Sequence, residues 1–442
     1  MKDWQEEFKR KQISAEEAAQ MVKSGDHISF TLGREAFSIG LAIAARIGEL
    51  RDVKVFQPFP GYDFGWYEPA WEESFKITLL MPTAVSQQMV DERRCDIEIN
   101  DILARSESTL RQSDVVITEL SPPDDKGFCS FGAALWNKRK HIKNGKLVLA
   151  EINDRLIRTY GDNSIHISEI DYFVPHQSSG ATVASGSLGG REVRQAAPYM
   201  QDITRYVSEL IRDGDTVQIG IGRVNERLVE LGLFNNKQDL GWYSEATPPG
   251  VIKLVREGVI NGKRKSLLPG KAIVTTLGGA SQEDMDWSSN NPLFWLVDVE
   301  YLWDTRNIAA NDNMVTINQA LTIDLSGQIS AESLGHKIFS GSGGQTAFAY
   351  GALLSKGGRG ITVLPATIND KDGKLTSRIV PSFEPGTAVT VTRNCVDHVV
   401  TEYGIARLRG KSLRQRCEEL IAIAHPDFRA GLTKEAHRLY WP

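Results

Sequence analysis

A short pattern of Gly-Asp turn and strand occurs twice in this chain of 442 residues, and it constrains the fold more than any other feature. Residues 25–34 read GDHISFTLGR and residues 214–223 read GDTVQIGIGR, so a turn, an apolar run and a glycine recur in the same order. An internal duplication of an α/β unit is the simplest explanation. Coincidence is the alternative, because Gly-Asp turns before strands are common. We favour duplication, which predicts two similar halves.

Apolar runs with the length and β-branching of buried strands alternate with patterns typical of helices. The runs are 27–31, 54–56, 75–80, 114–120 and 146–152, then 272–277, 361–364, 388–392 and 398–400. A capping box from Ser14 to Glu17 begins a helix that we expect to end at Gly25. This alternation predicts an α/β fold with two similar open α/β domains and mostly parallel sheets.

The chain is too long for one hydrophobic core and suits two domains. Gly and Ser become frequent between His176 and Gly190, before a helical pattern begins at Met200. We therefore predict an N-terminal domain of residues 1–190 and a C-terminal domain of residues 191–442. Aromatic residues crowd positions 59–67. They form either one wall of an acyl pocket or a packed surface loop, and we favour the loop.

The composition excludes several classes of protein. The net charge of -5 comes from intermixed acids and bases, which argues against nucleic-acid binding. No apolar signal core and no run of membrane-spanning length is present, so we expect a cytoplasmic protein without a membrane partner. The four cysteines lack CxxC spacing and the eight histidines lack HxxH spacing, which argues against a disulfide framework and a metal site.

The strongest candidate for chemistry is Glu245, within the stretch GWYSEATPPG of residues 241–250. It follows a short run that resembles the end of a strand and precedes a helical pattern at residues 251–259. A carboxylate there lies at the mouth of an α/β unit, where helix amides favour its ionised, nucleophilic form. The alternative is an acid that merely stabilises the helix N-terminus, which is a common arrangement.

Two glycine clusters provide backbone amides that can approach a ligand closely. Residues 218–222 read QIGIG at the end of a predicted strand, and residues 340–345 read SGSGGQ before a helix. The first cluster lacks the third glycine of a dinucleotide site, because Asn225 stands there, and no Walker lysine follows a glycine loop. A tight structural turn remains the alternative for the first cluster. Lys371 lies on a probable turn, where a solvated lysine is the ordinary interpretation.

These residues resemble the acetyl-CoA hydrolase/transferase family, in the branch of class I CoA-transferases that contains 4-hydroxybutyrate CoA-transferase. The resemblance covers nearly the whole chain. Its most specific segments are Gln218 to Gly222, Ser244-Glu245, Ile317 to Leu321, Asp324 to Gln328, Ser340 to Gln345, Thr401 to Ala406, Leu408 to Gly410 and Ala424 to Phe428.

The resemblance implies that Glu245 attacks an acyl-CoA to give an acyl-glutamyl anhydride and CoA thiolate, which then form a glutamyl-CoA thioester. It implies CoA contacts from Gln218, Ile219, Gly220, Ile221, Gly222, Gly343, Gly344 and Lys371. It also implies an active site at the interface of the two domains, and a homodimer or homotetramer.

Several positions depart from the family pattern. Ala246 stands where methionine usually follows the glutamate, and the run after Gly344 lacks the family's acid. Arg223 to Asn225 replace a small residue, an apolar residue and a proline, and the turn at Lys371 has two extra residues. These changes point to an altered acyl pocket. Arg223 would then pair with a second carboxylate on a dicarboxylic acyl group.

We therefore expect a CoA-transferase that moves CoA from a small acyl-CoA, acetyl-CoA or succinyl-CoA, to a carboxylic acid, with no metal. The first alternative is an acyl-CoA hydrolase, in which water resolves the intermediate. The second is a non-catalytic CoA-binding protein. A sugar-phosphate isomerase of similar architecture is a more distant alternative, since fold alone does not determine function.

Overall fold

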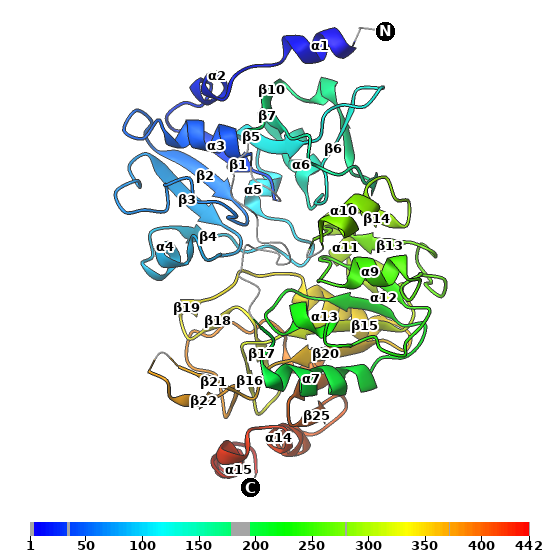
Figure 1. Cartoon of the computed structure of the whole chain (residues 1–442). Helices are drawn as coiled ribbons and strands as arrows, with labels where there is room; N and C mark the ends of the chain where they lie inside the picture. Colours follow the sequence, from blue (N-terminus) through cyan, green and yellow to red (C-terminus); the bar gives the residue numbers. More distant parts are fainter. Residues whose placement is uncertain (1–3, 33–35, 178–194, 279–280, 371, 442) are drawn as a thin grey trace. The chain divides into compact units, whose positions relative to one another are not determined.

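The computed structural model describes residues 4–32, 36–177, 195–278, 281–370 and 372–441. The chain forms two compact units, Met1–Glu192 with Ile273–Tyr301, and Val193–Ala272 with Leu302–Pro442. The boundary predicted between residues 190 and 191 lies outside the described residues. Residues 273–301 thus belong with the first unit although they lie late in the sequence (Figure 1).

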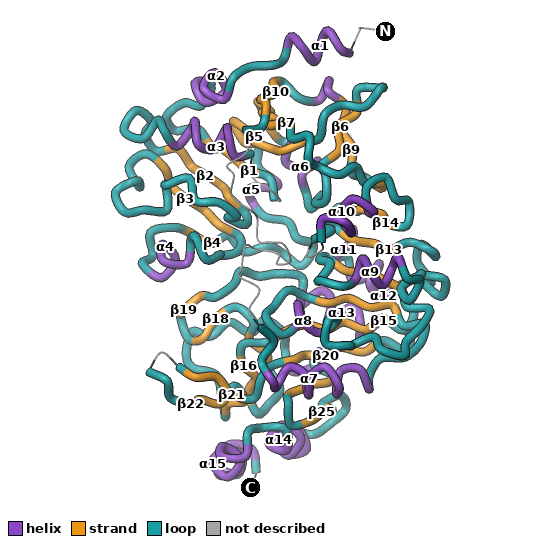
Figure 2. The backbone as a smooth tube through the Cα atoms, in the orientation of Figure 1, coloured by secondary structure: helices purple, strands orange, loops and turns teal. Residues whose placement is uncertain are grey.

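A parallel seven-stranded sheet organises the described part of the first unit, in the order β10-β7-β5-β1-β2-β3-β4 (Figure 2). Its strands are β1 (His27–Phe30), β2 (Val53–Gln57), β3 (Phe75–Leu79), β4 (Asp96–Ile97), β5 (Ser113–Leu120), β7 (Gly145–Ile152) and β10 (Tyr172–Pro175). The chain extends the sheet from β1 through β2 to β4, then returns to the other side of β1 with β5. The strand order therefore reverses between β1 and β5.

Short helices and minor strands complete the first unit. The helices are α1 (Trp4–Arg10), α2 (Ala15–Gln20), α3 (Phe37–Ala44), α4 (Gln87–Asp91), α5 (Glu107–Leu110), α6 (Lys138–Lys143), α10 (Gln282–Ser288) and α11 (Val299–Trp303), with a 3-10 turn at Ile167–Glu169. The minor strands are β6 (Phe128–Ser130), β8 (Tyr160–Gly161), β9 (Ser164–His166), β13 (Ala272–Val274) and β14 (Phe294–Leu296). Helix α11 ends two residues inside the second unit.

The capping box predicted at Ser14 is confirmed, because the Ser14 hydroxyl accepts from the Glu17 amide at 3.1 Å and the Glu17 carboxylate accepts from the Ser14 amide at 2.8 Å. The helix that it begins ends at Gln20, before Gly25. The crowded aromatic stretch is core rather than surface, since Trp66 and Phe64 are buried and pack on Phe30.

The second unit has a main sheet whose strands lie in the order β25-β24-β20-β15-β11-β12. These strands are β11 (Thr216–Ile219), β12 (Gly241–Ser244), β15 (Met314–Gln319), β20 (Arg359–Val363), β24 (His398–Thr401) and β25 (Gly404–Arg407). All neighbours are parallel except β24 and β25. The residues of β11, β12 and β15 are buried except Gln319, as expected for strands covered on both faces, whereas the edge strand β25 is mostly exposed or partly exposed.

Helices and small sheets surround this core. The helices are α7 (Pro198–Glu209), α8 (Asn225–Leu228), α9 (Val251–Arg256), α12 (Thr305–Ala309), α13 (Gln345–Leu354), α14 (Leu413–Ala422) and α15 (Pro426–Tyr440), with a 3-10 turn at Arg393–Cys395. The small strands are β16 (Thr322–Asp324), β17 (Ile329–Ser330), β18 (Ser333–Leu334), β19 (Lys337–Ile338), β21 (Thr367–Asn369), β22 (Leu375–Ser377) and β23 (Ile379–Val380).

The two units share one strand order. Strand β11 lies between β12 and β15 as β1 lies between β2 and β5, and both central strands begin two residues after the repeated glycine, Gly25 or Gly214. The prediction of two similar α/β units with mostly parallel sheets is confirmed. The shared order also supports an internal duplication.

Two strand assignments from sequence need correction. Residues 388–392 form no strand, and only Val391 makes an isolated bridge, to Ile329. Strand β15 lies at the centre of the second sheet and was not predicted as a strand. Its polar Thr316, Asn318 and Gln319 hide the apolar signal of a buried strand.

Lys265 is a buried base in the second unit. Its ammonium group donates to the carbonyls of Trp242 at 3.0 Å and Lys271 at 2.8 Å. Its stem passes over Gly241, where a Cβ would lie 2.4 Å from Lys265 Cγ, so only glycine fits. Burial lowers the pKa of Lys265 to about 7.

We expect this lysine to make the free energy of unfolding rise with pH between about 7 and the ordinary lysine value of 10.5. In that window the unfolded chain binds a proton that the folded chain has lost, which adds up to about 1.4 kcal/mol per pH unit. Denaturant unfolding of Lys265→Met across this window should give a shallower slope. Lys263→Met, at an exposed lysine, should keep the wild-type slope; equal slopes in all three proteins would contradict the assignment.

Candidate active site

Glu245 directly follows β12, at the carboxyl end of the strand. All four residues of β12 are buried. The hydroxyl of Ser244 accepts from the Ile219 amide at 3.3 Å and donates to the Ile219 carbonyl at 3.2 Å, which fastens it to the central strand β11. The backbone that carries Glu245 is therefore held by side-chain bonds as well as by the sheet.

The Glu245 carboxylate is half-buried and meets an indole. Trp303 Nε1–H donates to Glu245 Oε2 at 2.7 Å. Burial raises the pKa of Glu245 to about 7, and the bond from Trp303 acts in the opposite direction. The sequence predicts that helix amides favour the ionised form of Glu245. Instead α9 begins at Val251, six residues later, and burial has the larger effect on the pKa.

Gly344 lies against both members of this pair. A Cβ on Gly344 would be 2.6 Å from Trp303 Nε1 and 3.2 Å from Glu245 Oε2. Its φ of -73° suits any residue, so the reason for glycine here is space and not backbone conformation. The second glycine cluster, almost one hundred residues away in the sequence, thus comes to the carboxylate of Glu245. Gly343 precedes it and is partly exposed.

The first glycine cluster forms the loop after β11. A Cβ on Gly220 would lie 2.3 Å from Asn318 Oδ1, and one on Gly222, whose φ is +154°, would lie 2.6 Å from Gln319 Oε1. Gln319 also accepts from the Val224 amide at 2.8 Å. The end of β15 therefore clamps this loop at the point where the strand order of the second unit reverses.

Such reversal points are where open α/β sheets bind ligands. Gly220 and Ile221 are partly exposed there. Gln218 and Ile219 instead lie within β11; Ile219 is buried, and the Gln218 amide exchanges two 3.1 Å hydrogen bonds with Asn318. Their side chains support the loop, and contact with a ligand would have to come from Gly220 to Gly222. Lys371, the other predicted CoA contact, lies outside the described residues.

A basic cluster that sequence analysis did not identify lies near the same edge. Arg378 Nη1 donates to the carbonyls of Ala320 at 3.4 Å and Leu321 at 3.2 Å, in the turn that follows β15. Burial and the positive charge of Arg223 lower the pKa of Arg378, while Tyr199 and Glu402 oppose that shift. Arg223 itself is exposed. Arg378 leaves no signal in the sequence, because its partners are backbone carbonyls.

The segment from Asp324 to Gln328 builds a turn. Asp324 accepts from the amides of Ser326 at 3.0 Å and Gln328 at 2.9 Å, and Gly327 takes a φ of +95°. This part of the family resemblance therefore serves folding.

Within the described ranges, no group of three His, Cys, Asp or Glu side chains could hold a metal ion. No described helix is both long enough and apolar enough to cross a bilayer. 

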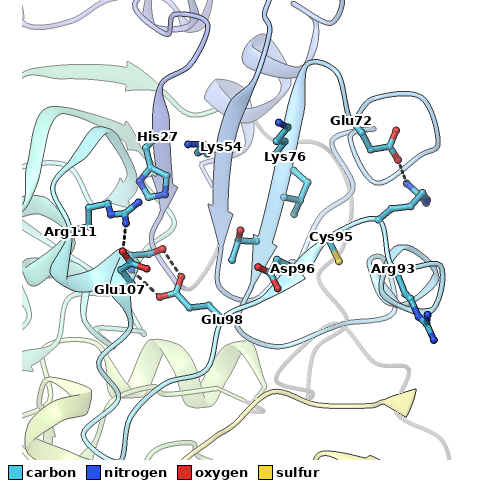
Figure 3. A pocket seen from close by; sticks show the side chains of 14 residues that line it. His27, Lys54, Glu72, Lys76, Arg93, Cys95, Asp96, Glu98, Glu107 and Arg111 are labelled. Atoms are coloured by element: carbon cyan, nitrogen blue, oxygen red, sulfur yellow. Dashed lines mark hydrogen bonds and ion pairs between the residues drawn. The ribbon is translucent and has the colours of Figure 1, made fainter. Parts of the chain in front are cut away.

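A cavity of about 600 Å³ lies in the first unit, and it contains none of the predicted site residues (Figure 3). His27, Lys54 and Lys76, at or next to the amino ends of β1, β2 and β3, line it with further charged side chains. Several of these charges are already paired, as Arg94 is with Glu72 at 2.8 Å. Its lining also includes Thr78, near the carboxyl end of β3, and Glu98, directly after β4.

Known proteins share this sequence and fold. The acetyl-CoA hydrolase/transferase C-terminal domain matches residues 280–436. The 4-hydroxybutyrate coenzyme A transferase of Clostridium kluyveri is 36% identical, over 98% of this chain and 99% of that protein. The succinyl-CoA:cyclohexane-1-carboxylate CoA transferase of Geobacter metallireducens is 34% identical, over 99% and 98%. The crystal structure of RipA from Yersinia pestis superposes with a TM-score of 0.89 at 28% identity, over 100% of both chains.

The chain belongs to the acetyl-CoA hydrolase/transferase family. It is an enzyme of the CoA-transferase class, as the relatives of full length are, which confirms the resemblance found in the sequence.

Gly344→Ala tests the close packing around Glu245. The added methyl group must displace Trp303 or the carboxylate, and misplacing a reacting group by about 1 Å costs about 100-fold in rate. We expect kcat/KM to fall by about that factor, and the added bulk to lower the free energy of unfolding by about 1–3 kcal/mol. Gly431→Ala, in α15 with open space around it, is the matched control and should keep wild-type activity. Wild-type activity in both variants would contradict this packing.

Proposed function

We propose that this enzyme moves CoA from a small acyl-CoA, acetyl-CoA or succinyl-CoA, to a carboxylic acid through covalent intermediates on Glu245. The observation that supports this most strongly is the meeting of Glu245, Trp303 and Gly344 at the carboxyl edge of the second unit's sheet. The names of two full-length relatives, which contain 4-hydroxybutyrate, succinyl-CoA and cyclohexane-1-carboxylate, agree with CoA transfer between carboxylic acids.

Glu245 first attacks the thioester carbonyl of the donor and expels CoA thiolate, giving a mixed acyl-glutamyl anhydride. The thiolate then attacks the glutamyl carbonyl and releases the donor acid, leaving a glutamyl-CoA thioester. The acceptor carboxylate attacks that thioester, and the expelled thiolate attacks the acceptor's own carbonyl. New acyl-CoA leaves and the Glu245 carboxylate is restored. A carboxylate suits this exchange because each intermediate retains a good leaving group.

The environment of Glu245 fits a nucleophile. Burial removes water that stabilises the anion, which makes the carboxylate more reactive, and a pKa of about 7 still leaves it largely ionised just above neutrality. In the Gly220 to Gly222 loop the Gly220 amide already donates to the Ile317 carbonyl at 2.8 Å, so the amides proposed to bind CoA are those of Ile221, Gly222, Gly343 and Gly344, with Lys371 as a further contact.

The remaining assignments are part of the same proposal. A homodimer or homotetramer with the active site at the domain interface rests on the family resemblance, whereas a cytoplasmic enzyme with domains of residues 1–190 and 191–442 rests on the sequence patterns. The main rival is acyl-CoA hydrolysis, in which water attacks either covalent intermediate. The ratio of acid-dependent transfer to hydrolysis in one assay separates the two reactions. A non-catalytic CoA-binding protein would bind CoA without either reaction.

Glu245→Gln should lower acyl exchange by about 10⁴-fold or more, because an amide cannot attack the thioester. The wild-type enzyme, incubated with acyl-CoA and trapped with borohydride or hydroxylamine, should carry its modification on the peptide that contains Glu245. Because the pKa of Glu245 is raised to about 7, its carboxylate takes up a proton as the pH drops through that value and can no longer attack. The value of kcat/KM should therefore fall over the same range.

Glu257→Gln, at an exposed acid after α9, is the control for these measurements and should behave as the wild type. Exchange at the native rate in Glu245→Gln, or a label on another peptide, would refute the proposal.

Arg223→Ala tests the acyl specificity. If Arg223 binds the second carboxylate of a dicarboxylic acyl group, its loss removes a charge-assisted hydrogen bond and should lower kcat/KM for succinyl-CoA by about 10- to 100-fold, with little change for acetyl-CoA. The nearby positive charge of Arg378 supports an anion at this place. Lys253→Ala, at an exposed lysine on α9, should leave the ratio of the two substrates unchanged. An unchanged ratio in Arg223→Ala would remove this role.

A further inference from the structure

Trp303 approaches one particular oxygen of Glu245. Its Nε1–H donates to Oε2 at 2.7 Å, and the indole is buried with 1% of its surface exposed. The residue before it is fixed as well, since Tyr243 in β12 donates from its hydroxyl group to the Leu302 carbonyl at 3.1 Å. Gly344 packs on the same indole, because a Cβ on this residue would lie only 2.6 Å from Trp303 Nε1. The donor is therefore held rigidly relative to the carboxylate.

In the reaction proposed above, on which this argument rests, Oε2 of Glu245 has a different role from Oε1. With Oε2 engaged by the indole, Oε1 is the oxygen that attacks the donor thioester. In the anhydride Oε1 is the bridging atom, so Oε2 becomes the carbonyl oxygen of the glutamyl group and remains so in the glutamyl-CoA thioester. When a thiolate or a carboxylate adds to Cδ, the electron pair of that carbonyl moves onto Oε2. The pair returns to Cδ as the leaving group departs.

A preorganised donor 2.7–3.1 Å from an oxygen that gains negative charge is what an oxyanion hole requires. We propose that the indole N–H of Trp303 is an oxyanion-hole donor for the glutamyl carbonyl of Glu245, and thus a catalytic group of this enzyme. It acts on the two steps in which the glutamyl carbonyl is attacked. It has no part in stabilising the first oxyanion, which forms on the acyl group of the donor.

A second buried indole shows that packing alone does not demand this bond. Trp242, in β12, is also buried, and its Nε1 has no hydrogen-bond partner among the described residues. The second unit thus accommodates an indole whose N–H is unpaired. Trp303 differs in that its N–H is aimed at the carboxylate. Trp242 therefore provides a matched control for any change at Trp303.

The test compares Trp303→Phe with Trp242→Phe. Both variants lose an indole N–H and the same ring volume from the interior. In rapid mixing with acyl-CoA at a pH above the acidic limbs of both variants, where Glu245 is ionised in each, the Trp303 variant should form the anhydride at a rate near that of the Trp242 variant. Its conversion to glutamyl-CoA and the attack by acceptor acid should both be slower by about 10²- to 10³-fold, the usual effect of removing one oxyanion donor.

The pH profile is a second readout that lost packing would not change. Because the Trp303 bond lowers the pKa of Glu245, its removal should move the acidic limb of kcat/KM to higher pH. The limb should stay in place in Trp242→Phe. If Trp303→Phe does not fold, 3-benzothienylalanine at position 303 replaces the N–H with sulfur in the same shape, and it should give the same rates and the same shift.

Equal step rates and equal acidic limbs in the two variants would overturn the role of Trp303. That result is distinguishable from failure of the proposed function, in which the wild-type enzyme itself would form no adduct at Glu245. An adduct in the wild type together with identical variants would refute Trp303 alone.

Discussion

Parallel pairing of β11 with β12 on one side and β15 on the other is the constraint on which the site depends. This pairing places the carboxyl ends of three strands at one edge. The neighbours there are Glu245, the loop from Gly220 to Gly222, and the side-chain amides of Asn318 and Gln319. Each strand end then holds the next, because Ser244 bonds to Ile219 and Gln319 bonds to Val224. The sheet topology thus determines which residues come together at this edge.

Burial gives this edge its chemical character. A carboxylate in water would be ionised but well solvated, whereas Glu245 is held where its pKa approaches neutrality, and the N–H of Trp303 opposes that rise. The same unit contains Lys265, whose charge is disfavoured by the same cause. Folding supplies the free energy that offsets both perturbations.

Much of this could be predicted from the sequence, and the failures have physical reasons. Glu245 and Gly344 were found through local patterns, since a carboxylate after a strand and a glycine before a helix leave clear signals. Trp303 left none, because an aromatic residue in an apolar run is read as core. Strand β15 was missed since polar residues at its carboxyl end serve the neighbouring loop instead of the core. Which oxygen a donor faces is decided by tertiary packing and has no counterpart in the sequence.

The shared strand order of the two units has a consequence for how such a chain evolves. His27 and Thr216 hold the same place in the repeat, and they pair with Lys54 and Gly241. Pro58 and Glu245 each lie four residues after that partner, so Pro58 has the position in the first unit that Glu245 has in the second. Proline offers no side-chain oxygen. An internal duplication, which the shared strand order supports, thus leaves the scaffold in both units but a carboxylate at this position in the second unit only.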